Sequence, residues 1–116
     1  MNTRDLILPE DKLFTPSIRL TIMILLLTHK KVNFTELQKL LNLTPGNLDH
    51  HLTKLEKAGY VKTYKKLSPW RSPLTLIELT SSGKQTFVSY LRNFRDILNK
   101  ISLSSERGPL KKGKDV

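Results

Sequence analysis

The chain has 116 residues, enough for one compact domain with a single core. It carries 20 lysines and arginines against 10 aspartates and glutamates, so its formal net charge is +10. This excess favours a polyanionic partner, nucleic acid first and an anionic membrane second, although charge can also serve only to resist aggregation. The absence of cysteine excludes disulfides, thiolate zinc sites and a cysteine nucleophile, and it fits an intracellular protein.

The N-terminal part predicts a short leader followed by an apolar helix. Residues 1–15 contain acids and a proline rather than a secretory signal, with at most one helical turn near residues 6–8. Pro16 suits the first turn of a helix over 16–28, because its missing N–H has no partner there in any case. The apolar run 20–27 is too short to span a bilayer, which takes about 20 residues. Its apolar residues occupy more than one face, which favours a second buried surface such as a subunit interface.

Two short helices are predicted next. Residues 32–34 are compatible with a very short strand, and Thr35 is the expected cap of a helix that ends before a turn at 42–43. Thr44 is the expected cap of the following helix, with Pro45 at its first position and Gly59 as its stop. In that helix the spacing of four and three predicts one apolar face, made of Leu48, Leu52 and Leu55.

The opposite face of this helix is polar and basic, as a helix that enters the DNA major groove requires. Asn47 is suited to pair with adenine, and His50 to donate to a base acceptor or a phosphate. Asp49 would repel phosphate, and it is suited either to accept from a cytosine amino group or to hold a neighbouring side chain in place. The alternative for each residue is a solvated helix face. The candidate DNA contacts of this helix are Thr44, Pro45, Gly46, Asn47, Asp49, His50 and Lys54.

The histidines do not predict a metal site. His50 and His51 adjoin in sequence, so they point about 100° apart on a helix and cannot chelate one ion together. His51 lies nearer the leucine face and is expected to be half-buried and hydrogen-bonded, in a structural role. With His29 isolated and no acidic cluster present, we expect neither a metal nor another cofactor.

A basic hairpin is predicted after the third helix. Strands over 60–66 and 74–79 flank a loop over 67–73, and the segment 60–73 has four cations and no acid. A cationic β-loop beside a recognition helix suits backbone phosphates or the minor groove. Trp70 either packs over the sugar-phosphate backbone or folds back as a hydrophobic plug, and the plug is the favoured alternative. The candidate DNA contacts of this hairpin are Lys62, Lys65, Lys66, Trp70 and Arg71.

The last helix predicts a subunit interface. Thr80 is its expected cap, and an apolar stripe runs along residues 81–101, longer than a core of this size needs. A homodimer explains the excess, and a monomer with the helix packed along its own body is the alternative. The candidate interface residues are Ile22, Phe87, Tyr90, Leu91, Phe94, Leu98 and Ile101. Residues 102–116 lose the pattern and are expected to form a basic, disordered tail.

Two segments resemble the ArsR/MarR-type winged-helix transcriptional regulators of bacteria and archaea. They are LTPGNLDHHLTKLEKAGYV at 43–61 and IELTSSGKQTF at 77–87, within a resemblance that covers about residues 14–100. The resemblance implies three helices with a two-stranded wing, assembled as a homodimer on palindromic DNA. The metal-sensing members use cysteine or clustered histidine and acid ligands, which this chain lacks.

These patterns predict an α+β fold, mainly α with a small β-hairpin, organised as a winged helix-turn-helix over residues 16–101. The predicted function is sequence-specific binding of double-stranded DNA by a homodimeric transcriptional regulator in the cytoplasm, associated with the nucleoid. Two alternatives are an architectural DNA-coating protein and a winged-helix protein-interaction module. No nucleophile–base pair or phosphate-binding glycine loop is present, so we do not expect an enzyme. A membrane partner is not expected, and nothing indicates a small-molecule effector, which stays open.

Overall fold

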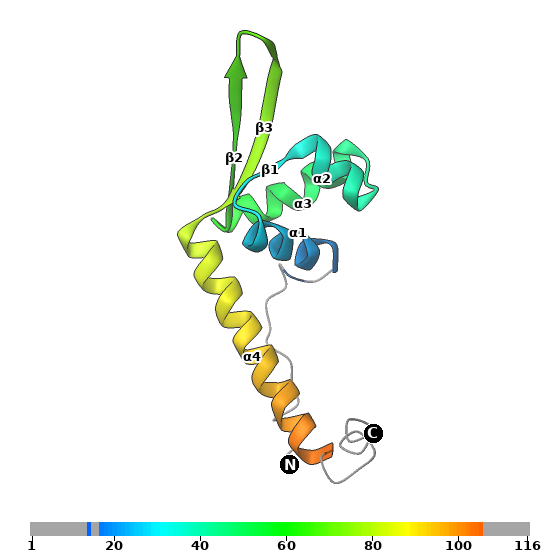
Figure 1. Ribbon diagram of the computed structural model, residues 1–116, viewed down its shortest axis with the longest axis vertical. Coiled ribbons are helices and arrows are strands. Elements are labelled where there is room, and N and C mark those ends of the chain that lie inside the picture. The colour runs from blue at the N-terminus through cyan, green and yellow to red at the C-terminus, as the bar shows by residue number, and fades with distance from the viewer. Residues whose placement is uncertain (1–13, 15–16, 106–116) are drawn as a thin grey trace. The chain divides into compact units, whose positions relative to one another are not determined.

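The computed structural model describes residue 14 and residues 17–105, which contain four helices and three strands (Figure 1). In chain order they are α1 (Ser17–Thr28), β1 (Val32–Asn33), α2 (Phe34–Leu41), α3 (Pro45–Lys57), β2 (Val61–Ser68), β3 (Arg71–Leu79) and α4 (Ser81–Ser105). This order confirms the predicted α+β winged helix-turn-helix. One compact unit ends at Phe87, and a second includes α4 from Val88 onward. The expected helical turn at residues 6–8 and most of the expected tail lie outside the described residues.

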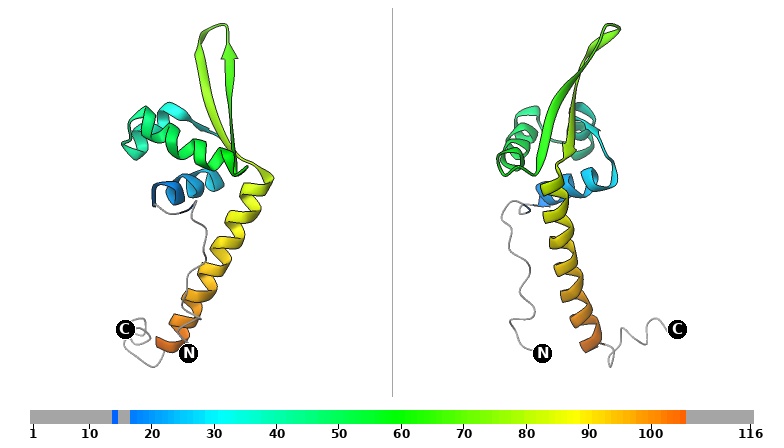
Figure 2. Two further views of the ribbon diagram at one scale, coloured as in Figure 1. Left: turned by 180° about the vertical axis from the view of Figure 1, so that it is seen from behind. Right: turned by 90° about the vertical axis from the view of Figure 1, so that its left-hand side faces the viewer.

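The three strands form one antiparallel sheet, in the order β1-β3-β2. The pairs Val32 with Ile77 and Thr63 with Ile77 place β3 in the middle. The predicted wing is therefore joined by a third strand, the two-residue β1. Figure 2 shows from two sides that the β2–β3 hairpin extends well beyond α1, α2 and α3.

The hairpin is longer than the sequence predicted. The expected seven-residue loop over 67–73 is wrong, because the strands continue until only Pro69 and Trp70 remain between them. Lys66 pairs with Leu74, and Ser68 pairs with Arg71. Between these two pairs β2 has one residue and β3 has two, so β3 contains one extra residue. The extra residue makes a β-bulge near Pro73. A bulge tolerates proline, because it leaves a backbone N–H without a ladder partner.

Helix boundaries follow local capping. Thr35 does not cap α2 as expected, because the Asn33 side chain accepts hydrogen bonds from the backbone N–H groups of Thr35 and Glu36, at 2.8 and 3.3 Å. α2 ends at Asn42, whose φ of 54° lies in the left-handed region that asparagine tolerates. The last helix runs to Ser105 rather than 101, so part of the expected tail is helical.

The core of the unit that ends at Phe87 takes side chains from α1, α2, α3, β2, β3 and the start of α4. Its apolar side chains are 3% exposed or less, and they pack between the helices and the sheet. Burying one leucine-sized side chain stabilises the fold by roughly 1.5–3 kcal/mol. The core residues are Phe14, Ile22, Met23, Leu26, Leu37, Leu48, Leu52, Leu55, Val61, Ile77 and Phe87.

Two glycines connect α3, the wing and α4. Gly59 has a φ of 80°, so it turns the chain after α3 as predicted. Gly83 lies in the first turn of α4, and a Cβ there would collide with the backbone carbonyl of Tyr60. At the same junction Thr80 accepts from the Gly83 N–H at 2.9 Å, and the Thr80 N–H donates to the Tyr60 carbonyl at 3.0 Å. The glycine in the Leu-Thr-x-x-Gly segment is thus required by close approach of two backbones.

Replacing Gly83 by alanine is expected to destabilise this junction, because backbone on both sides must move to admit the new Cβ. The expected loss is about 1–3 kcal/mol of unfolding free energy. It corresponds to a fall in Tm of several degrees for a domain of this size. Thermal unfolding followed by circular dichroism measures the change. Gly46→Ala is the matched control, since a Cβ at Gly46 meets nothing within 4 Å. Equal effects at both positions would contradict the close approach.

Candidate nucleic-acid interface

α3 begins at a well-formed cap and docks through leucines. The Thr44 hydroxyl accepts from the Asn47 N–H at 3.1 Å, and Pro45 occupies the first helical position, as predicted. Leu48, Leu52 and Leu55 are buried on one face, which confirms the predicted stripe. This docking fixes which residues of α3 turn outward.

The outward face of α3 contains all of its sequence-predicted DNA contacts. Each of these side chains is exposed: Thr44, Pro45, Gly46, Asn47, Asp49, His50 and Lys54. Lys57 is exposed as well, in the last turn. Amide, imidazole, carboxylate and ammonium groups therefore share one accessible surface. That surface can donate to and accept from base edges and can also meet phosphates.

A buried arginine connects α1 to this helix. Arg19 is 8% exposed, and its guanidinium donates to the Nδ1 atom of His51 over 3.0 Å. Because arginine only donates, His51 must present an unprotonated Nδ1. Burial lowers the pKa of His51 from 6.5, and the positive charges of Arg19, His50 and Lys54 lower it further. The expected half-buried, hydrogen-bonded role of His51 is confirmed.

A carboxylate near the base of the wing gathers groups from three segments. Glu78 on β3 accepts a hydrogen bond of 2.7 Å from the Tyr64 hydroxyl on β2. Its oxygens also lie 3.7 Å from the Lys62 amine and 3.9 Å from the Lys31 amine. The Tyr64 hydrogen bond and the two cations lower the pKa of Glu78, and that bond raises the pKa of Tyr64. Lys62 is thus partly neutralised within the protein.

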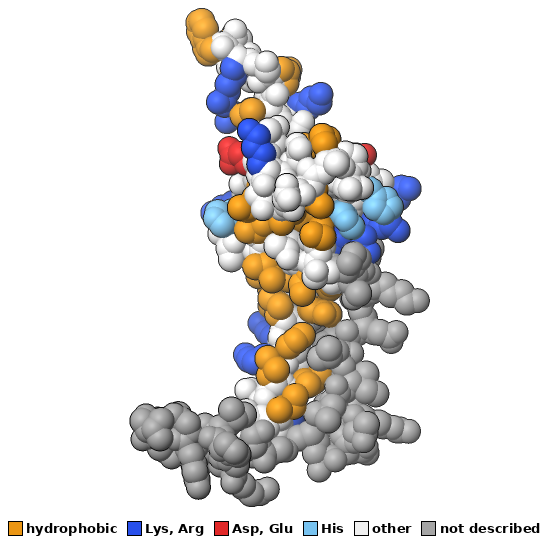
Figure 3. All heavy atoms as spheres, turned by 90° about the vertical axis from the view of Figure 1, so that its right-hand side faces the viewer, with side chains coloured by type: hydrophobic (Ala, Val, Ile, Leu, Met, Phe, Trp, Pro, Cys, Tyr) orange, Lys and Arg blue, Asp and Glu red, His pale blue; other side chains and the backbone are white. Residues whose placement is uncertain are grey.

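The rest of the wing charge lies nearer the tip. Lys65, Lys66 and Arg71 are exposed, and no described carboxylate lies within ion-pairing distance of them. Trp70 is 90% exposed, so the favoured expectation of a hydrophobic plug is wrong. The long hairpin carries Trp70 beyond the reach of the core. Figure 3 shows a hydrophobic group at the far end of the hairpin, with basic side chains below it.

The expected interface residues divide into two groups. Ile22 and Phe87 are fully buried, with the Phe87 ring against Phe14 at 5.1 Å, so the structure corrects their assignment to a subunit interface. Other residues of the same protomer already cover them. The remaining candidates on α4 keep some exposure: Tyr90, Leu91, Phe94, Leu98 and Ile101. Figure 3 shows hydrophobic side chains in a row along this helix.

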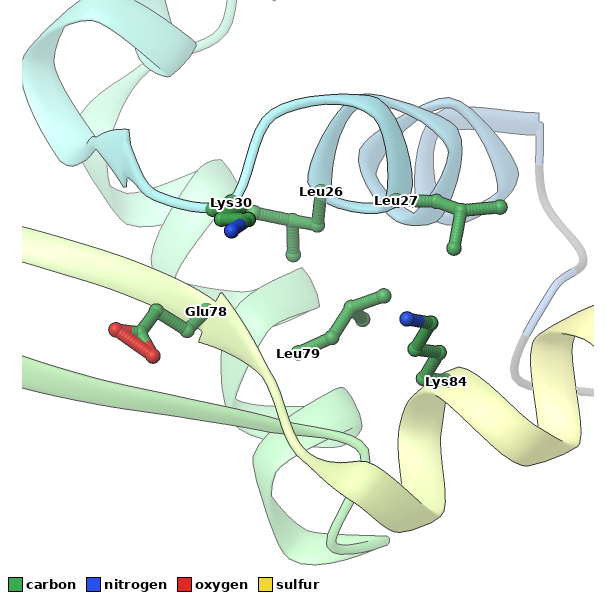
Figure 4. Close-up of a pocket in the computed structure, with 6 residues that line it drawn as sticks. All are labelled: Leu26, Leu27, Lys30, Glu78, Leu79 and Lys84. Atoms are coloured by element: carbon green, nitrogen blue, oxygen red, sulfur yellow. The ribbon is translucent and has the colours of Figure 1, made fainter.

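A small cavity lies between the end of α1, the end of β3 and the first turn of α4. Its volume is about 220 Å³, and Leu26, Leu27, Lys30, Glu78, Leu79 and Lys84 line it. Figure 4 shows the Lys84 amine directed toward the space between Leu27 and Leu79, and the Glu78 carboxylate turned away. Small-molecule sites usually enclose about 300–1,000 Å³, so this cavity provides no basis for an effector.

Two other classes of partner, a metal ion and a membrane, have no matching feature in the described residues. Within residues 14 and 17–105, no group of three or more histidine, aspartate or glutamate side chains is placed to hold a metal ion. Over the same residues, none of the helices has the length and apolar character needed to cross a membrane.

Three of the residues that organise this surface were not predicted from sequence. Arg19 is a lone cation within the apolar helix SIRLTIMILLLT, a pattern that signals a buried charge with a partner. Glu78 is the only acid in the second segment of the resemblance, IELTSSGKQTF, and Tyr64 lies opposite its strand. Their meeting depends on how β2 and β3 pair side by side, and a strand pattern alone does not show which side chains meet across two strands.

The chain belongs to the winged-helix DNA-binding domain family, whose model matches residues 18–98. It is 40% identical over 80 residues to the uncharacterized protein MJ0432 of Methanocaldococcus jannaschii. The match spans 69% of this chain and 86% of that protein.

Solved structures share both the fold and part of the sequence. A transcriptional regulator homologue from Pyrococcus horikoshii is 37% identical, with a TM-score of 0.73 over 79% of this chain and 90% of that one. The protein AbfR, in its reduced form bound to DNA, is 25% identical, with a TM-score of 0.58 over 69% of this chain and 54% of that one. The Pyrococcus horikoshii protein is a transcriptional regulator homologue, and the resemblance to ArsR/MarR-type winged-helix proteins is confirmed.

Protonation of His51 should weaken the fold. Its folded-state pKa lies below 6.5, so the unfolded chain takes up this proton first as the pH falls. The resulting loss of stability grows as the pH drops below 6.5 and is absent well above it. Wild-type Tm should therefore fall between about pH 7.5 and pH 5, and His51→Gln should flatten that fall. The exposed His29→Gln serves as control and should keep the wild-type slope. Identical slopes in all three proteins would assign the pH dependence to other groups.

Proposed function

We propose that this protein binds specific sequences of double-stranded DNA as a homodimeric transcriptional regulator, with α3 in the major groove and the wing on the adjacent backbone or minor groove. The observation that carries the proposal is the exposed polar face of α3 on a helix held by three buried leucines. A rigid support is what base readout requires, because hydrogen bonds to base edges tolerate little displacement.

The positive charge of the wing also supports DNA as the partner. The hairpin segment 60–73 has four cations and no acid, and Glu78 partly neutralises only Lys62 among them. Phosphate contacts provide affinity and orientation, whereas contacts at base edges provide specificity. On this proposal the wing supplies most of the phosphate contacts, and Asn47, Asp49 and His50 supply the contacts at base edges. The DNA-bound relative AbfR shows that this fold can bind DNA. We expect the protein to act in the cytoplasm, on the nucleoid.

Selection of bound duplexes from a random library at near-physiological salt tests the proposal. A palindromic motif is the expected result, with half-sites about one helical turn apart, since each subunit of a dimer reads one half-site. Retention of DNA without any motif would instead support an architectural protein. No retention at all would favour a protein-interaction module.

Base readout by α3 can be measured on the selected duplex. Asn47→Ala and His50→Ala should each weaken binding to that duplex by about 1–3 kcal/mol while leaving binding to random DNA nearly unchanged. Fluorescence anisotropy titrations on both duplexes give the two affinities. Lys39→Ala is a suitable control, because Lys39 is exposed on α2 rather than on α3. Equal losses on both duplexes would rule out base readout by these residues.

The dimer should depend on the apolar stripe of α4. Leu98 is 51% exposed, and Leu91 lies two turns before it on the same face. Leu91→Asp combined with Leu98→Asp places two charges in that stripe and should give monomers in sedimentation velocity. Ser89→Asp with Asn93→Asp adds the same charges at exposed positions on the opposite face and should stay dimeric. If the leucine variant also stays dimeric, the interface lies elsewhere.

A further inference from the structure

Two large apolar side chains at the tip of the β2–β3 hairpin are exposed to solvent. Trp70 is 90% exposed and Leu67 is 74% exposed, the highest values among the large hydrophobic residues that the structure describes. A tryptophan can bury about 150–250 Å², so its exposure leaves a large apolar surface in water. Contiguous exposed apolar surface marks contact sites more often than hydrophobic residues scattered singly do.

The local backbone holds this tip outward. Ser68 and Arg71 pair across the two-residue turn, and Pro69 restricts the backbone at its first position. The Trp70 N–H donates to the Ser68 hydroxyl over 3.2 Å. The bulge opposite Leu67 adds local twist. Trp70 is therefore presented at the end of an ordered hairpin, away from α1, α2 and α3 (Figure 1).

Basic side chains flank this apolar tip on both faces of the hairpin. Directly opposite residues in an antiparallel pair share a face, and the face alternates along each strand. Lys66 pairs with Leu74 and therefore lies on one face, whereas Lys65 pairs with Thr75 on the other. Arg71 adds a charge beside the turn itself. The hairpin therefore ends in apolar side chains and carries positive side chains on both of its faces.

The DNA minor groove has the complementary shape and charge. Two phosphate backbones wall a groove about 6 Å wide, with base pairs at its floor. Paired strands lie about 4.8 Å apart, so the end of a hairpin enters such a groove more easily than its side. Proteins that place apolar side chains between base steps there unstack the step and kink the duplex toward the major groove, which opens the minor groove.

We propose that Trp70, supported by Leu67, is an apolar wedge that enters the minor groove and partly unstacks one base step, while Lys65 and Lys66 bind the two phosphate walls. This inference rests on the proposed DNA-binding function and adds to it a specificity-determining residue. Stacking of a base on an aromatic ring repays part of the unstacking cost. The protein then bends its site as it binds.

The wedge also predicts a sequence preference without hydrogen bonds. Pyrimidine–purine steps such as TA and CA unstack and kink more easily than other steps. A selected site should therefore prefer such a step where the wing tip enters, outside the bases that α3 contacts. Substituting the tip should remove that preference and leave the preference under α3 intact.

The full-length protein supplies its own probe, because Trp70 is the single tryptophan of the chain. Titration with the selected duplex should quench its fluorescence as the indole stacks on bases. Duplexes with 2-aminopurine at successive positions should brighten at one step near the wing and not at the centre of the site. Energy transfer between end labels on the duplex measures the bend.

Three variants separate the wedge from general DNA binding. Trp70→Ala should lose the bend and the 2-aminopurine signal and bind the selected duplex roughly 10- to 100-fold more weakly. Trp70→Phe keeps an aromatic ring and should retain the bend. Leu40→Ala is the matched control, since Leu40 is 67% exposed but lies on α2. Both positions are exposed, so the Tm of all three variants should change little.

The outcomes distinguish the wedge from the function on which it rests. Binding by the wild type without a bend or quenching would overturn the wedge and leave the proposed function standing. Absence of binding to any duplex would defeat both. Lys65→Ala with Lys66→Ala should flatten the salt dependence, and an unchanged slope would remove the wing from the DNA. A blue shift of Trp70 on anionic phosphatidylglycerol vesicles, with no quenching by DNA, would assign the tip to a membrane surface and overturn the proposal.

Discussion

The burial of three leucines on one side of α3 is the constraint on which the rest of the surface depends. Leu48, Leu52 and Leu55 are each 2% exposed or less, and their removal from water fixes the rotation of the helix. Once that rotation is fixed, the intervening polar residues can only point outward. Arg19 reinforces the same contact through His51, so a charge buried in α1 also positions the helix that carries the polar face.

The wing is held to the domain only near its base. Near its base the hairpin is tied to the domain by Ile77 and Val61 in the core and by the Glu78 carboxylate, which gathers Tyr64, Lys62 and Lys31. Beyond that point no core remains to be filled, and the side chains become basic and apolar toward solvent. A hairpin anchored at one end and free of the core at the other is suited to reach a second surface on the same partner.

On the proposed function, the two surfaces divide the tasks of recognition. Polar groups on a rigid helix can distinguish base edges, whereas cations and an apolar tip on a hairpin respond to groove shape, charge and deformability. The family match and the related solved regulators place both surfaces in a fold that binds DNA. The wing of this chain ends in an exposed tryptophan, where a polar tip would satisfy electrostatics alone.

Sequence alone determined the helices, the leucine stripe, the Thr44 cap and the polar face of α3, because these depend on spacing and local hydrogen bonds. It also identified the basic wing, since charge is counted along the chain. Only tertiary structure decided the outcome where distant residues meet. The wing strands were predicted too short because strand propensity along the chain does not show that two strands continue to pair beyond a β-bulge. Trp70 was expected to pack inward because the sequence does not show how far the hairpin tip lies from the core. Ile22 and Phe87 were assigned to an interface because an apolar pattern shows that a side chain is buried without showing which surface buries it.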